Sequence, residues 1–297
     1  MVLRGGELVA EPALLEVPGV THRYVQVGGL RVHVAEAGDG PPLVLLHGWP
    51  QHWYLWRHQI PELAKHYRVI APDLRGHGWT DAPATGYDKD NLAADLIGLL
   101  DALGLDRVRL VGHDWGGWVG FLACMRAPER FDRFLALNIA HPWPSMSPAA
   151  VRSLWRFWYQ VVVGSPLGAL LIRRTPFISR GVLGTIKGGA LSRRDRAAFA
   201  ERWRVPARAR ASVALYRTFL LRELPQVRRG KYRRTPMSTK ARLVFGTADP
   251  AISPSLLEGY EEYAERMDLR WVPGAGHFIV DEQPDRVLAE IQEFMAD

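Results

Sequence analysis

The residues with the clearest chemical potential lie between Val111 and Gly117, in the order Val-Gly-His-Asp-Trp-Gly-Gly. A mostly apolar run at 108–111 leads into this segment and a helix-like stretch follows it, which predicts a strand, a sharp turn and a helix. The three glycines fit the small side chains that such a turn demands. Asp114 stands at the tip of the turn, where a carboxylate can attack an electrophilic carbon and form an ester with it.

An ester formed at Asp114 must be hydrolysed, and histidine is the side chain best suited to activate water near neutral pH. His277 follows the predicted strand 269–272 within a glycine-rich loop, which is where such a base belongs in an open α/β sheet. Asp249 follows the predicted strand 241–245 and can orient the histidine and stabilise its charged form. Nucleophile, acid and base thus follow one another in the chain order of α/β hydrolases.

Each of these three residues also has a purely structural interpretation. Asp114 could be the N-cap of the following helix, Asp249 could begin a turn, and His277 could be an ordinary loop residue. Their joint placement at predicted strand ends, in the right order, favours the catalytic interpretation for all three.

A second turn of interest, His47-Gly48-Trp49-Pro50, follows the apolar run 43–46. In hydrolases of this architecture, a backbone N–H from this turn and the N–H after the nucleophile together bind an oxyanion. By position, the two donors are the backbone N–H groups of Trp49 and Trp115. The alternative is a tight turn before a helix with no chemical role.

The elements that must position these residues alternate between strands and helices over most of the chain. A hairpin around Gly28-Gly29 and short apolar runs predict strands, and the leucines of 90–103 have helical spacing. A helix containing Tyr260 and another over 287–294 complete the pattern. The predicted strands are residues 24–27, 30–35, 43–46, 69–71, 108–111, 134–139, 241–245 and 269–272. Alternation of this kind predicts a mostly parallel sheet covered by helices on both faces.

The alternation stops in residues 142–236, which we call the cap and expect to be a helical insert between the sixth and seventh core strands. Its amphipathic segments lie at 153–163, 193–204 and 210–221. Residues 1–141 and 237–297 form the predicted core domain. The cap holds 20 Lys and Arg against 3 Asp and Glu, a balance of +17, which leaves −10 for the core.

Composition narrows the class of protein. The 297 residues suit one large domain with an insert, and 47% hydrophobic with 23% charged residues is ordinary for a globular protein. No uncharged apolar run is long enough to span a membrane, and residues 1–16 lack a signal-peptide pattern. The single cysteine, Cys124, excludes an internal disulfide and fits the reducing cytoplasm, where we expect the protein to act. Motifs for nucleic-acid binding are absent, so no nucleic acid is expected as a partner.

Taken together, these motifs resemble the epoxide hydrolase family of α/β hydrolases over nearly the whole chain. His47-Gly48-Trp49-Pro50 resembles that family's HGxP motif, and Asp114, Asp249 and His277 stand where its triad stands. The resemblance implies an α/β-hydrolase fold with an inserted helical cap, and an ester on Asp114 that water cleaves to release a vicinal diol. It also implies a small hydrophobic epoxide as substrate, with no metal and no organic cofactor.

The resemblance further implies two tyrosine hydroxyls from the cap, which hold the epoxide oxygen. Tyr216, within Ala-Leu-Tyr-Arg, resembles the second of them, and Tyr159 is the best match to the first. Tyr232, the one other tyrosine of the cap, has an arginine-rich setting that indicates exposure. Tyr159 and Tyr216 could instead belong to the packed interior of the cap. By position in the motifs, the substrate pocket is expected to include His47, Pro50, His113, Trp115 and Phe278.

A haloalkane dehalogenase is the main alternative, because that family shares the aspartate nucleophile and even Asp-Trp at the tip of the turn. A leaving halide needs N–H donors, which could come from Trp115 and one of three cap tryptophans, Trp155, Trp158 or Trp203. The residue before Pro50 is tryptophan, where some dehalogenases carry asparagine, and the two cap tyrosines favour the epoxide.

A third class of function is a catalytically silent binding protein on a hydrolase scaffold. Its interaction surface would be the basic cap, which could also make weak peripheral contact with an anionic membrane. The intact triad argues against a silent scaffold, and a solvated arginine-rich exterior is the simpler interpretation of the cap. A monomer or a homodimer is expected, as for related enzymes.

Overall fold

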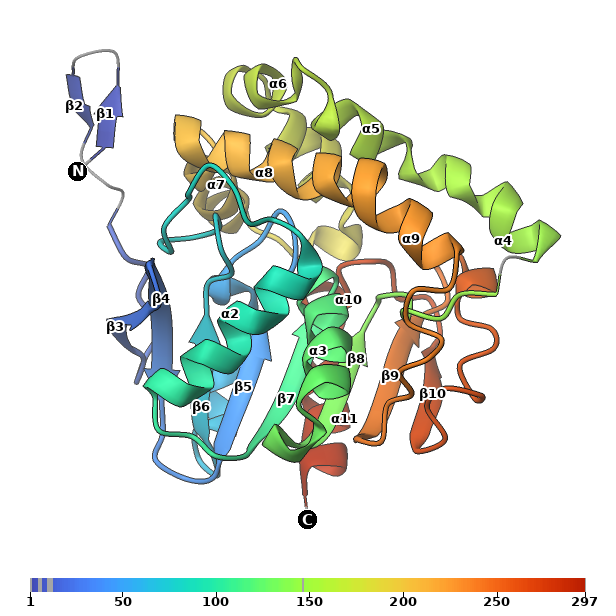
Figure 1. The fold of residues 1–297 in the computed structure, drawn as a ribbon. Coiled ribbons are helices and arrows are strands. Elements are labelled where there is room, and N and C mark those ends of the chain that lie inside the picture. Colours follow the sequence, from blue (N-terminus) through green and yellow to red (C-terminus); the bar gives the residue numbers. More distant parts are fainter. Residues whose placement is uncertain (1, 5–6, 10–12, 146, 297) are drawn as a thin grey trace.

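The computed structural model describes residues 2–4, 7–9, 13–145 and 147–296. Its centre is an eight-stranded sheet with the order β10-β9-β8-β7-β5-β6-β4-β3 (Figure 1). The strands from β10 to β6 run parallel, and β4 and β3 are antiparallel at one edge. The sheet consists of β3 (Thr21–Val27), β4 (Leu30–Ala37), β5 (Pro42–Leu46), β6 (Arg68–Pro72), β7 (Val108–His113), β8 (Phe131–Leu137), β9 (Lys240–Gly246) and β10 (Met267–Val272). The mostly parallel sheet predicted from the sequence is confirmed. A separate short pair, β1 (Val2–Arg4) and β2 (Glu7–Val9), lies near the N-terminus.

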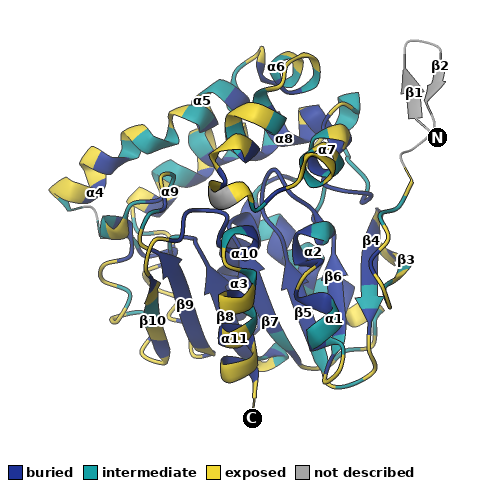
Figure 2. Ribbon diagram, turned by 180° about the vertical axis from the view of Figure 1, so that it is seen from behind, coloured by how far each residue is buried: buried dark blue, intermediate teal, exposed yellow. Residues whose placement is uncertain are grey.

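Strands with apolar side chains on both faces explain why helices cover the sheet on both sides. In β5, Leu43 and Leu45 join one buried cluster, whereas Val44 and Leu46 join the other, as the pleat requires. The helices that cover the two faces are α2 (Lys89–Ala102) and α3 (Trp115–Arg126) on one side, and α1 (Ile60–Leu63) and α11 (Pro284–Met295) on the other (Figures 1 and 2).

The cap forms a layer of helices above the carboxyl ends of the parallel strands (Figure 1). Its helices are α4 (Pro148–Ser153), α5 (Trp158–Gly164), α6 (Gly168–Arg174), α7 (Arg193–Arg202), α8 (Pro206–Thr218) and α9 (Leu224–Arg228). They follow β8 and precede β9, so the predicted helical insert between the sixth and seventh core strands is confirmed. The segment predicted at 153–163 is divided among the end of α4, a 3-10 turn and α5.

The helix predicted around Tyr260 does not form. Residues 258–264 are in turns and irregular backbone, with the backbone N–H groups of Tyr263 and Ala264 donating to the Tyr260 carbonyl. Gly259 has a φ of 84°, which a right-handed helix cannot contain. The apolar spacing of this segment therefore reflects packed turns rather than a helix.

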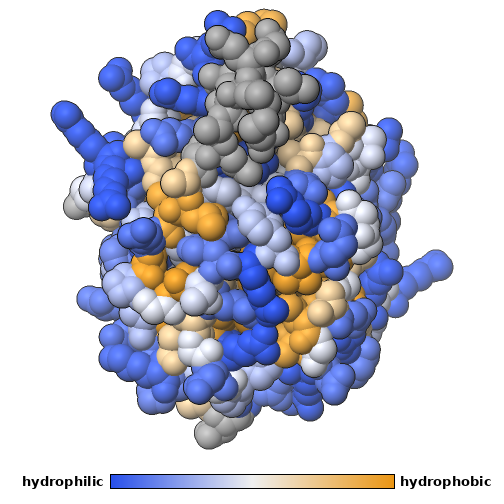
Figure 3. Space-filling model, turned by 90° about the vertical axis from the view of Figure 1, so that its left-hand side faces the viewer, coloured by the Kyte–Doolittle hydropathy of each residue, from blue (hydrophilic) through white to orange (hydrophobic). Residues whose placement is uncertain are grey.

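The surfaces of the two layers differ. Among the described residues, most of the exposed large hydrophobic side chains belong to the cap, namely Val151, Trp155, Trp158, Val161, Leu167, Leu170 and Leu221. Figure 2 shows exposed residues along the outer cap helices, above a sheet whose central strands are buried. On the face beside β3 and β4, hydrophilic side chains cover most of the surface (Figure 3). Within the described ranges, the structure contains no helix with the length and apolar character needed to cross a membrane.

Candidate active site

Asp114 lies between the end of β7 and the first residue of α3, with a φ of 50°. Asp114 occupies the N-cap position of α3, but its side chain makes no hydrogen bond to the first turn, so helix capping does not explain the carboxylate. Instead, Asp114 Oδ1 accepts a hydrogen bond from the backbone N–H of Trp49 at 2.9 Å. A positive φ is uncommon for a residue other than glycine. At Asp114, the positive φ occurs together with a carboxylate that contacts the His47–Pro50 turn and not the first turn of α3.

Close approach of two turns explains why glycine is needed around Asp114. A Cβ on Gly48 would collide with the Asp114 carboxylate, and a Cβ on Gly116 would collide with the main-chain carbonyls of Leu46 and His47. The two turns can approach this closely only because both positions lack a side chain. The requirement for small residues that the sequence predicts at the elbow is therefore confirmed.

Three side chains from three different strand ends form one connected line. His277 Nε2 lies 3.4 Å from Asp114 Oδ2, and His277 Nδ1 lies 2.9 Å from Asp249 Oδ2. Asp114 follows β7, Asp249 follows β9 and His277 follows β10, and the parallel direction of these strands brings their ends to one edge of the sheet. All three side chains are buried. The structure thus brings together the residues that the chain order selects.

The charges of this line favour a protonated His277. Burial alone would lower the pKa of His277, but the charge of Asp249 and hydrogen bonds to both carboxylates outweigh burial and raise this pKa to about 10. Burial would likewise raise the pKa of Asp249, and the adjacent His277 overcomes that effect and lowers it. With this raised pKa, His277 is an imidazolium at neutral pH.

Asp249 makes the contacts expected for both of the roles that the sequence allowed. Its Oδ1 accepts hydrogen bonds from the backbone N–H groups of Ala251 and Ile252, at 2.7 and 2.9 Å, as expected for a residue that begins a turn. Its Oδ2 faces His277 at 2.9 Å. Since the turn holds one oxygen, the other has a fixed direction toward the imidazole.

Asn138, which sequence reasoning missed, completes the support of this line. Its Nδ2 donates to Asp249 Oδ2 at 2.8 Å and to the carbonyl of Gly276 at 2.9 Å. Its Oδ1 accepts from the backbone N–H of Gly246 at 3.1 Å. Asn138 directly follows β8 and has a φ of 44°, which asparagine adopts more readily than most residues. The available signal was a polar residue at the end of an apolar strand.

One of the two predicted oxyanion donors already contacts the carboxylate. The backbone N–H of Trp49 bonds to Asp114 Oδ1, and the following peptide bond to Pro50 is cis. Trp115 is the first residue of α3, where backbone N–H groups have no acceptor within the helix. Both main-chain groups therefore belong to the surroundings of the Asp114 carboxyl group.

Two cap tyrosines pack against the tryptophan of the same turn. The ring centroid of Trp49 lies 6.3 Å from that of Tyr159 on α5 and 5.1 Å from that of Tyr216 on α8, and the two tyrosine rings are 5.9 Å apart. Burial raises the pKa of both phenols, and the charge of Asp114 raises each of them further. Both hydroxyls are therefore protonated at neutral pH and can donate a hydrogen bond.

Tyr232 differs from the expectation drawn from its arginine-rich surroundings. Its side chain is buried, and its hydroxyl donates to Asp90 Oδ2 at 3.2 Å, beside the ion pair of Lys231 with the same carboxylate. This tyrosine joins the cap to α2 and is not among the residues grouped around Trp49.

A cavity of about 190 Å³ lies beside Trp49 and His277. Residues from both layers line it, including Trp49, Tyr159, His277 and Phe278 together with Trp158 and Phe177 of the cap. An aromatic lining with few polar groups suits an apolar ligand. Trp158 is also 58% exposed, so it extends from the cavity to the protein surface.

Of the five residues predicted for the substrate pocket, Phe278 lines this cavity. The other four are not part of its described lining, namely His47, Pro50, His113 and Trp115. Their polar atoms hold loops in place: His47 Nε2 accepts from the backbone N–H of Leu74 at 3.0 Å, and His113 Nε2 donates to the carbonyl of His277 at 2.9 Å. Burial lowers the pKa of His47 to about 3 and that of His113 to about 4, so both rings are neutral supports.

Side-chain hydrogen bonds join the cap to the Trp49 turn. Trp49 Nε1 donates to Ser212 Oγ on α8 at 2.5 Å, and Trp203 Nε1 donates to the carbonyl of Pro50 at 2.6 Å. All of these side chains are buried. The turn that bonds to Asp114 is therefore attached to the cap as well as to the core.

A buried ion pair joins the two layers behind Trp115. Lys89, at the start of α2, donates from Nζ to Glu223 Oε2 and to the carbonyl of Leu215, both at 2.8 Å. The same ammonium group lies 4.6 Å from the ring centroid of Trp115. Leu215 directly precedes Tyr216 in α8, so this core lysine holds the helix that carries a catalytic candidate.

Known proteins with similar sequences and structures identify the family of this chain. The chain matches the family model described as alpha/beta hydrolase fold over residues 41–284. It is 32% identical over 292 residues to the soluble epoxide hydrolase of Corynebacterium sp. (strain C12), covering 93% of this chain and 98% of that protein. The structure of epoxide hydrolase CorEH without ligand is similar with a TM-score of 0.75 and 31% identity, over 93% of this chain and 99% of the other. Epoxide hydrolase VrEH1 from Vigna radiata is similar with a TM-score of 0.81 and 27% identity, over 93% and 98%.

The family model covers the sheet strands from β5 to β10, the cap and all three residues of the connected line. The fold class predicted from the sequence is confirmed. The chain belongs to the α/β-hydrolase family, in which its full-length relatives include epoxide hydrolases.

Proposed function

We propose that this protein hydrolyses an epoxide to a vicinal diol through a covalent ester on Asp114. The observation that carries the proposal is the grouping of Tyr159 and Tyr216 around Trp49, whose backbone N–H bonds to the Asp114 carboxylate. Opening an epoxide needs a nucleophile for carbon and a proton donor for oxygen. A carboxylate next to two protonated phenols meets both needs within one aromatic site.

The first step follows from the different surroundings of the two carboxylate oxygens. Asp114 Oδ1 is held by the Trp49 N–H at 2.9 Å, whereas Oδ2 lies farther, 3.4 Å, from His277 Nε2 and would be the oxygen that attacks the epoxide carbon. The carbon–oxygen bond of the ring breaks as the ester bond forms, and the released alkoxide takes a proton from Tyr159 or Tyr216. The two phenols would bind the epoxide oxygen beforehand, so that the charge develops next to donors already in place.

Ester formation changes the charge next to His277 and so prepares the second step. The esterified Asp114 is neutral, and it no longer contributes to the raised pKa of His277. The imidazolium can then return a proton to the tyrosinate and become a neutral base. It is still oriented by the 2.9 Å contact with Asp249.

Water completes the reaction at the carbonyl carbon of the ester. Neutral His277 takes a proton from water, and the hydroxide adds to the Asp114 carbonyl, whose oxyanion would be held by the N–H groups of Trp49 and Trp115. Collapse breaks the acyl carbon–oxygen bond, and the acid proton passes to the leaving alkoxide. The diol departs, with Asp114 charged and His277 protonated as at the start.

Dehalogenation by the same nucleophile is the second candidate function. The observation behind it is the buried indole N–H of Trp115, which interacts with the Tyr216 hydroxyl and could turn to a leaving halide instead. Of the predicted second donors, Trp203 gives its N–H to the Pro50 carbonyl. Trp155 and Trp158 remain as candidates, and both side chains are largely exposed.

A paired assay with styrene oxide and a 1-bromoalkane distinguishes the two candidates. We expect diol from the epoxide and little bromide from the haloalkane, because the tyrosines protonate an alkoxide but add nothing for a halide. Bromide release without diol formation would replace the proposal by the alternative.

Trapping the ester tests the covalent step directly. In a His277→Gln variant, intact-mass spectrometry after exposure to styrene oxide should detect the protein plus one epoxide. The double variant with Asp114→Asn is the control and should gain no mass. In single-turnover experiments in ¹⁸O-water, the label should enter the Asp114 carboxyl group first; direct labelling of the diol would exclude an ester intermediate.

We further propose that residues 142–236 act as a substrate-binding cap on a catalytic core formed by 1–141 and 237–297. Support comes from the cavity between them, whose lining includes Tyr159 and Phe177 from the cap and His277 and Phe278 from the core. Its volume and aromatic lining favour a small hydrophobic epoxide.

A further inference from the structure

The residues that line the aromatic cavity beside Trp49 and His277 differ in exposure from one part of the cavity to another. Trp49 and His277 are buried, and both contact Asp114. The exposed residues of the described lining are Trp158, Gly181, Thr185 and Pro250. The cavity therefore has a closed end beside Asp114 and an open end at the protein surface.

Two segments of the cap contribute the apolar walls of this cavity. In the first segment, Trp158 and Tyr159 are the first two residues of α5. In the second, Phe177 and Val182 are the first and last residues of a π-helical turn. A Cβ on Gly181 of this turn would lie 3.4 Å from the Phe177 ring, so the ring lies beside the glycine. A ligand that extends from the closed end to the open end would contact side chains of both segments.

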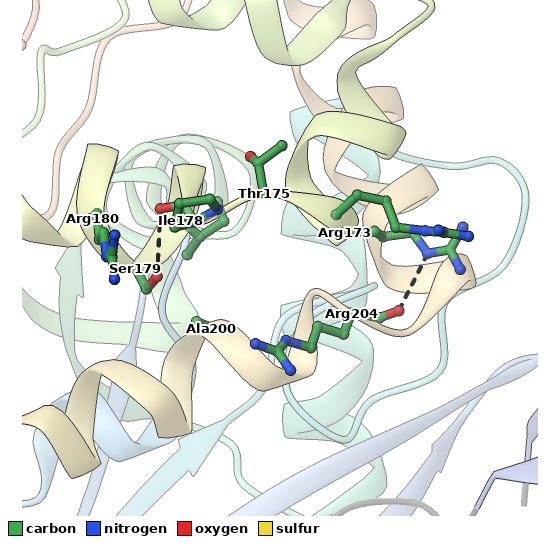
Figure 4. A pocket seen from close by; sticks show the side chains of 9 residues that line it. Arg173, Thr175, Ile178, Ser179, Arg180, Ala200 and Arg204 are labelled. Atoms are coloured by element: carbon green, nitrogen blue, oxygen red, sulfur yellow. Dashed lines mark hydrogen bonds between the residues drawn. The ribbon is translucent and has the colours of Figure 1, made fainter.

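The π-helical turn is shared between the aromatic cavity and a separate hollow between α6 and α7 (Figure 4). Ile178, Ser179 and Arg180 line that hollow. Phe177 and Gly181 line the aromatic cavity instead. π-helical turns are rare and often occur at functional sites. Here the turn forms a wall that directs one aromatic ring toward the cavity.

The polar side chains that the cap contributes to the described lining already have partners in the protein. Arg156 Nη1 donates to the carbonyl of Asp249 at 3.1 Å, and the Thr185 hydroxyl donates to the carbonyl of Val182 at 2.7 Å. The Tyr159 hydroxyl is the proposed donor to the epoxide oxygen. The cap therefore offers mainly apolar surface to the rest of a bound ligand.

The size of the cavity limits what it can enclose. Cavities that bind drug-sized ligands measure about 300–1,000 Å³, whereas this cavity measures about 190 Å³. It can enclose an epoxide ring with a small substituent, and a longer substituent must leave through the open end beside Trp158. A substituent on the second epoxide carbon would have to enter the closed end, where Trp49, His277 and Phe278 are buried.

We propose that the space between Trp158 and Phe177 holds the one apolar substituent of a terminal epoxide, and that Trp158 determines which substituents bind. The epoxide ring then lies at the closed end, beside Tyr159 and His277, and the substituent points to the open end. This substrate class rests on the proposed function, because it narrows the epoxide that the same site would take. Holding the substituent involves no covalent change.

Kinetics with substituents of different size test the role of Trp158. With styrene oxide, Trp158→Ala should raise KM about tenfold and change kcat less than about twofold, because the phenyl ring loses a contact that is equal in the ground state and the transition state. With propylene oxide, whose methyl group offers little surface to Trp158, KM should change less than about twofold. Trp155→Ala is the matched control, since this side chain is 70% exposed and outside the described lining; KM for both epoxides should stay at the wild-type value.

A second substituent on the epoxide tests the closed end. In the wild type, kcat/KM for trans-β-methylstyrene oxide should be about a hundredfold lower than for styrene oxide, because the added methyl group has no space at the closed end. A para-alkyl group on styrene oxide should change kcat/KM less than about threefold, because it passes Trp158 into solvent. Equal kcat/KM for styrene oxide and its trans-β-methyl derivative would overturn the proposal.

Binding measured without turnover separates this proposal from the proposed function. In an Asp114→Asn background, which cannot form the ester, calorimetry should show that Trp158→Ala weakens styrene oxide binding about tenfold and that Trp155→Ala does not. Binding that depends on Trp158, in a protein whose wild type forms no diol, would support the subsite and overturn the proposed function. Equal affinities in the two tryptophan variants, or no binding of styrene oxide, would overturn the subsite. Circular dichroism melting checks that each variant is folded.

Discussion

In the core, each residue of the connected line follows a parallel strand, and both aspartates accept hydrogen bonds from backbone N–H groups, whereas Tyr159 and Tyr216 lie on cap helices. The Asp114 turn is fixed by collisions that only glycine avoids, and Asp249 by the turn that it begins. The cap tyrosines are not placed by a turn of this kind. Their positions depend on how the cap rests on the core, through side-chain contacts such as that of Trp49 with Ser212.

This contrast separates two properties of the site. The core determines which bond chemistry is available, because the charges of its carboxylates and imidazole are coupled over 2.9 and 3.4 Å. The cap determines where the substrate oxygen is received. Substitutions in the core should therefore abolish chemistry, and substitutions at the contacts between the layers should change stability and positioning.

The largest effect is expected for Asp114→Asn. Without the nucleophile, epoxide turnover should fall by about 10⁴-fold or more, and no ester should form. The cap should remain in place, because its contacts do not involve this carboxylate. Steady-state kinetics and circular dichroism measure the two properties; a folded variant that retained more than a hundredth of the activity would contradict a catalytic role for this residue.

The same variant should change the pH dependence of folding. The folded pKa of His277 is raised to about 10, above the value of about 6.5 for an unfolded histidine. Its charged form therefore stabilises the fold fully below pH 6.5, and this contribution is lost as the pH rises through 10. Loss of the Asp114 charge should lower the folded pKa of His277 and so narrow the pH range over which the charged imidazole stabilises the fold. Urea unfolding between these pH values should show that the free energy of unfolding falls more steeply with pH in the wild type than in Asp114→Asn. Equal slopes in the two proteins would show that the charges of Asp114 and His277 are not coupled.

Two neighbouring ion pairs between core and cap, one buried and one exposed, test how much each stabilises the packing of the cap on the core. Lys89→Met leaves Glu223 buried without its cation and should lower the free energy of unfolding by about 3–5 kcal/mol. Lys231→Met breaks the adjacent, exposed pair with Asp90 and should cost less than about 1 kcal/mol. Chemical denaturation measures both. Similar losses of free energy of unfolding in the two variants would mean that burial does not make one ion pair more important for stability than the other.

The cap tyrosines should affect the rate of ester formation more than stability. Tyr216→Phe keeps the ring against Trp49 but removes the proton donor, and ester formation should slow by about a hundredfold. Tyr159→Phe should act in the same direction, and the double variant more strongly. Tyr232→Phe is the control, since its hydroxyl bonds to Asp90. Stopped-flow tryptophan fluorescence follows the step; equal rates in Tyr216→Phe and Tyr232→Phe would remove Tyr216 from the mechanism.

The difference between the layers also explains what the sequence could predict. For Asp114, Asp249 and His277, the candidate residue directly follows its strand and turn in the chain. Local pattern and chain order are therefore enough to predict these three residues. Asn138 follows a strand in the same way, but its role depends on an amide that reaches the ends of two other strands, β9 and β10. That contact has no signature in a single sequence.

The pocket could not be predicted because it depends on packing between layers. His47 and His113 stand in the motifs, yet their ring nitrogens bond to backbone groups. The lining instead includes Phe177 and Trp158, whose positions follow from how the cap helices pack. Helical spacing predicted that the cap is helical, but it could not indicate which side of each helix faces the core.

The smallest expected effect concerns the hydrogen bond between Trp49 and Ser212. Ser212→Ala leaves the buried indole N–H of Trp49 without an acceptor, which should lower the free energy of unfolding by about 1–2 kcal/mol even though alanine favours the helix. Turnover should fall modestly, because the turn that bonds to Asp114 loses its attachment to the cap.

Ser153→Ala is the matched control for this last variant. The Ser153 hydroxyl bonds to the Ala150 carbonyl within its own helix, so its removal should change stability by less than about 0.5 kcal/mol. Chemical denaturation and steady-state kinetics compare the two serines. If Ser212→Ala matched Ser153→Ala in both measurements, the cap would not help to hold the Trp49 turn, and the core would position its oxyanion donor unaided.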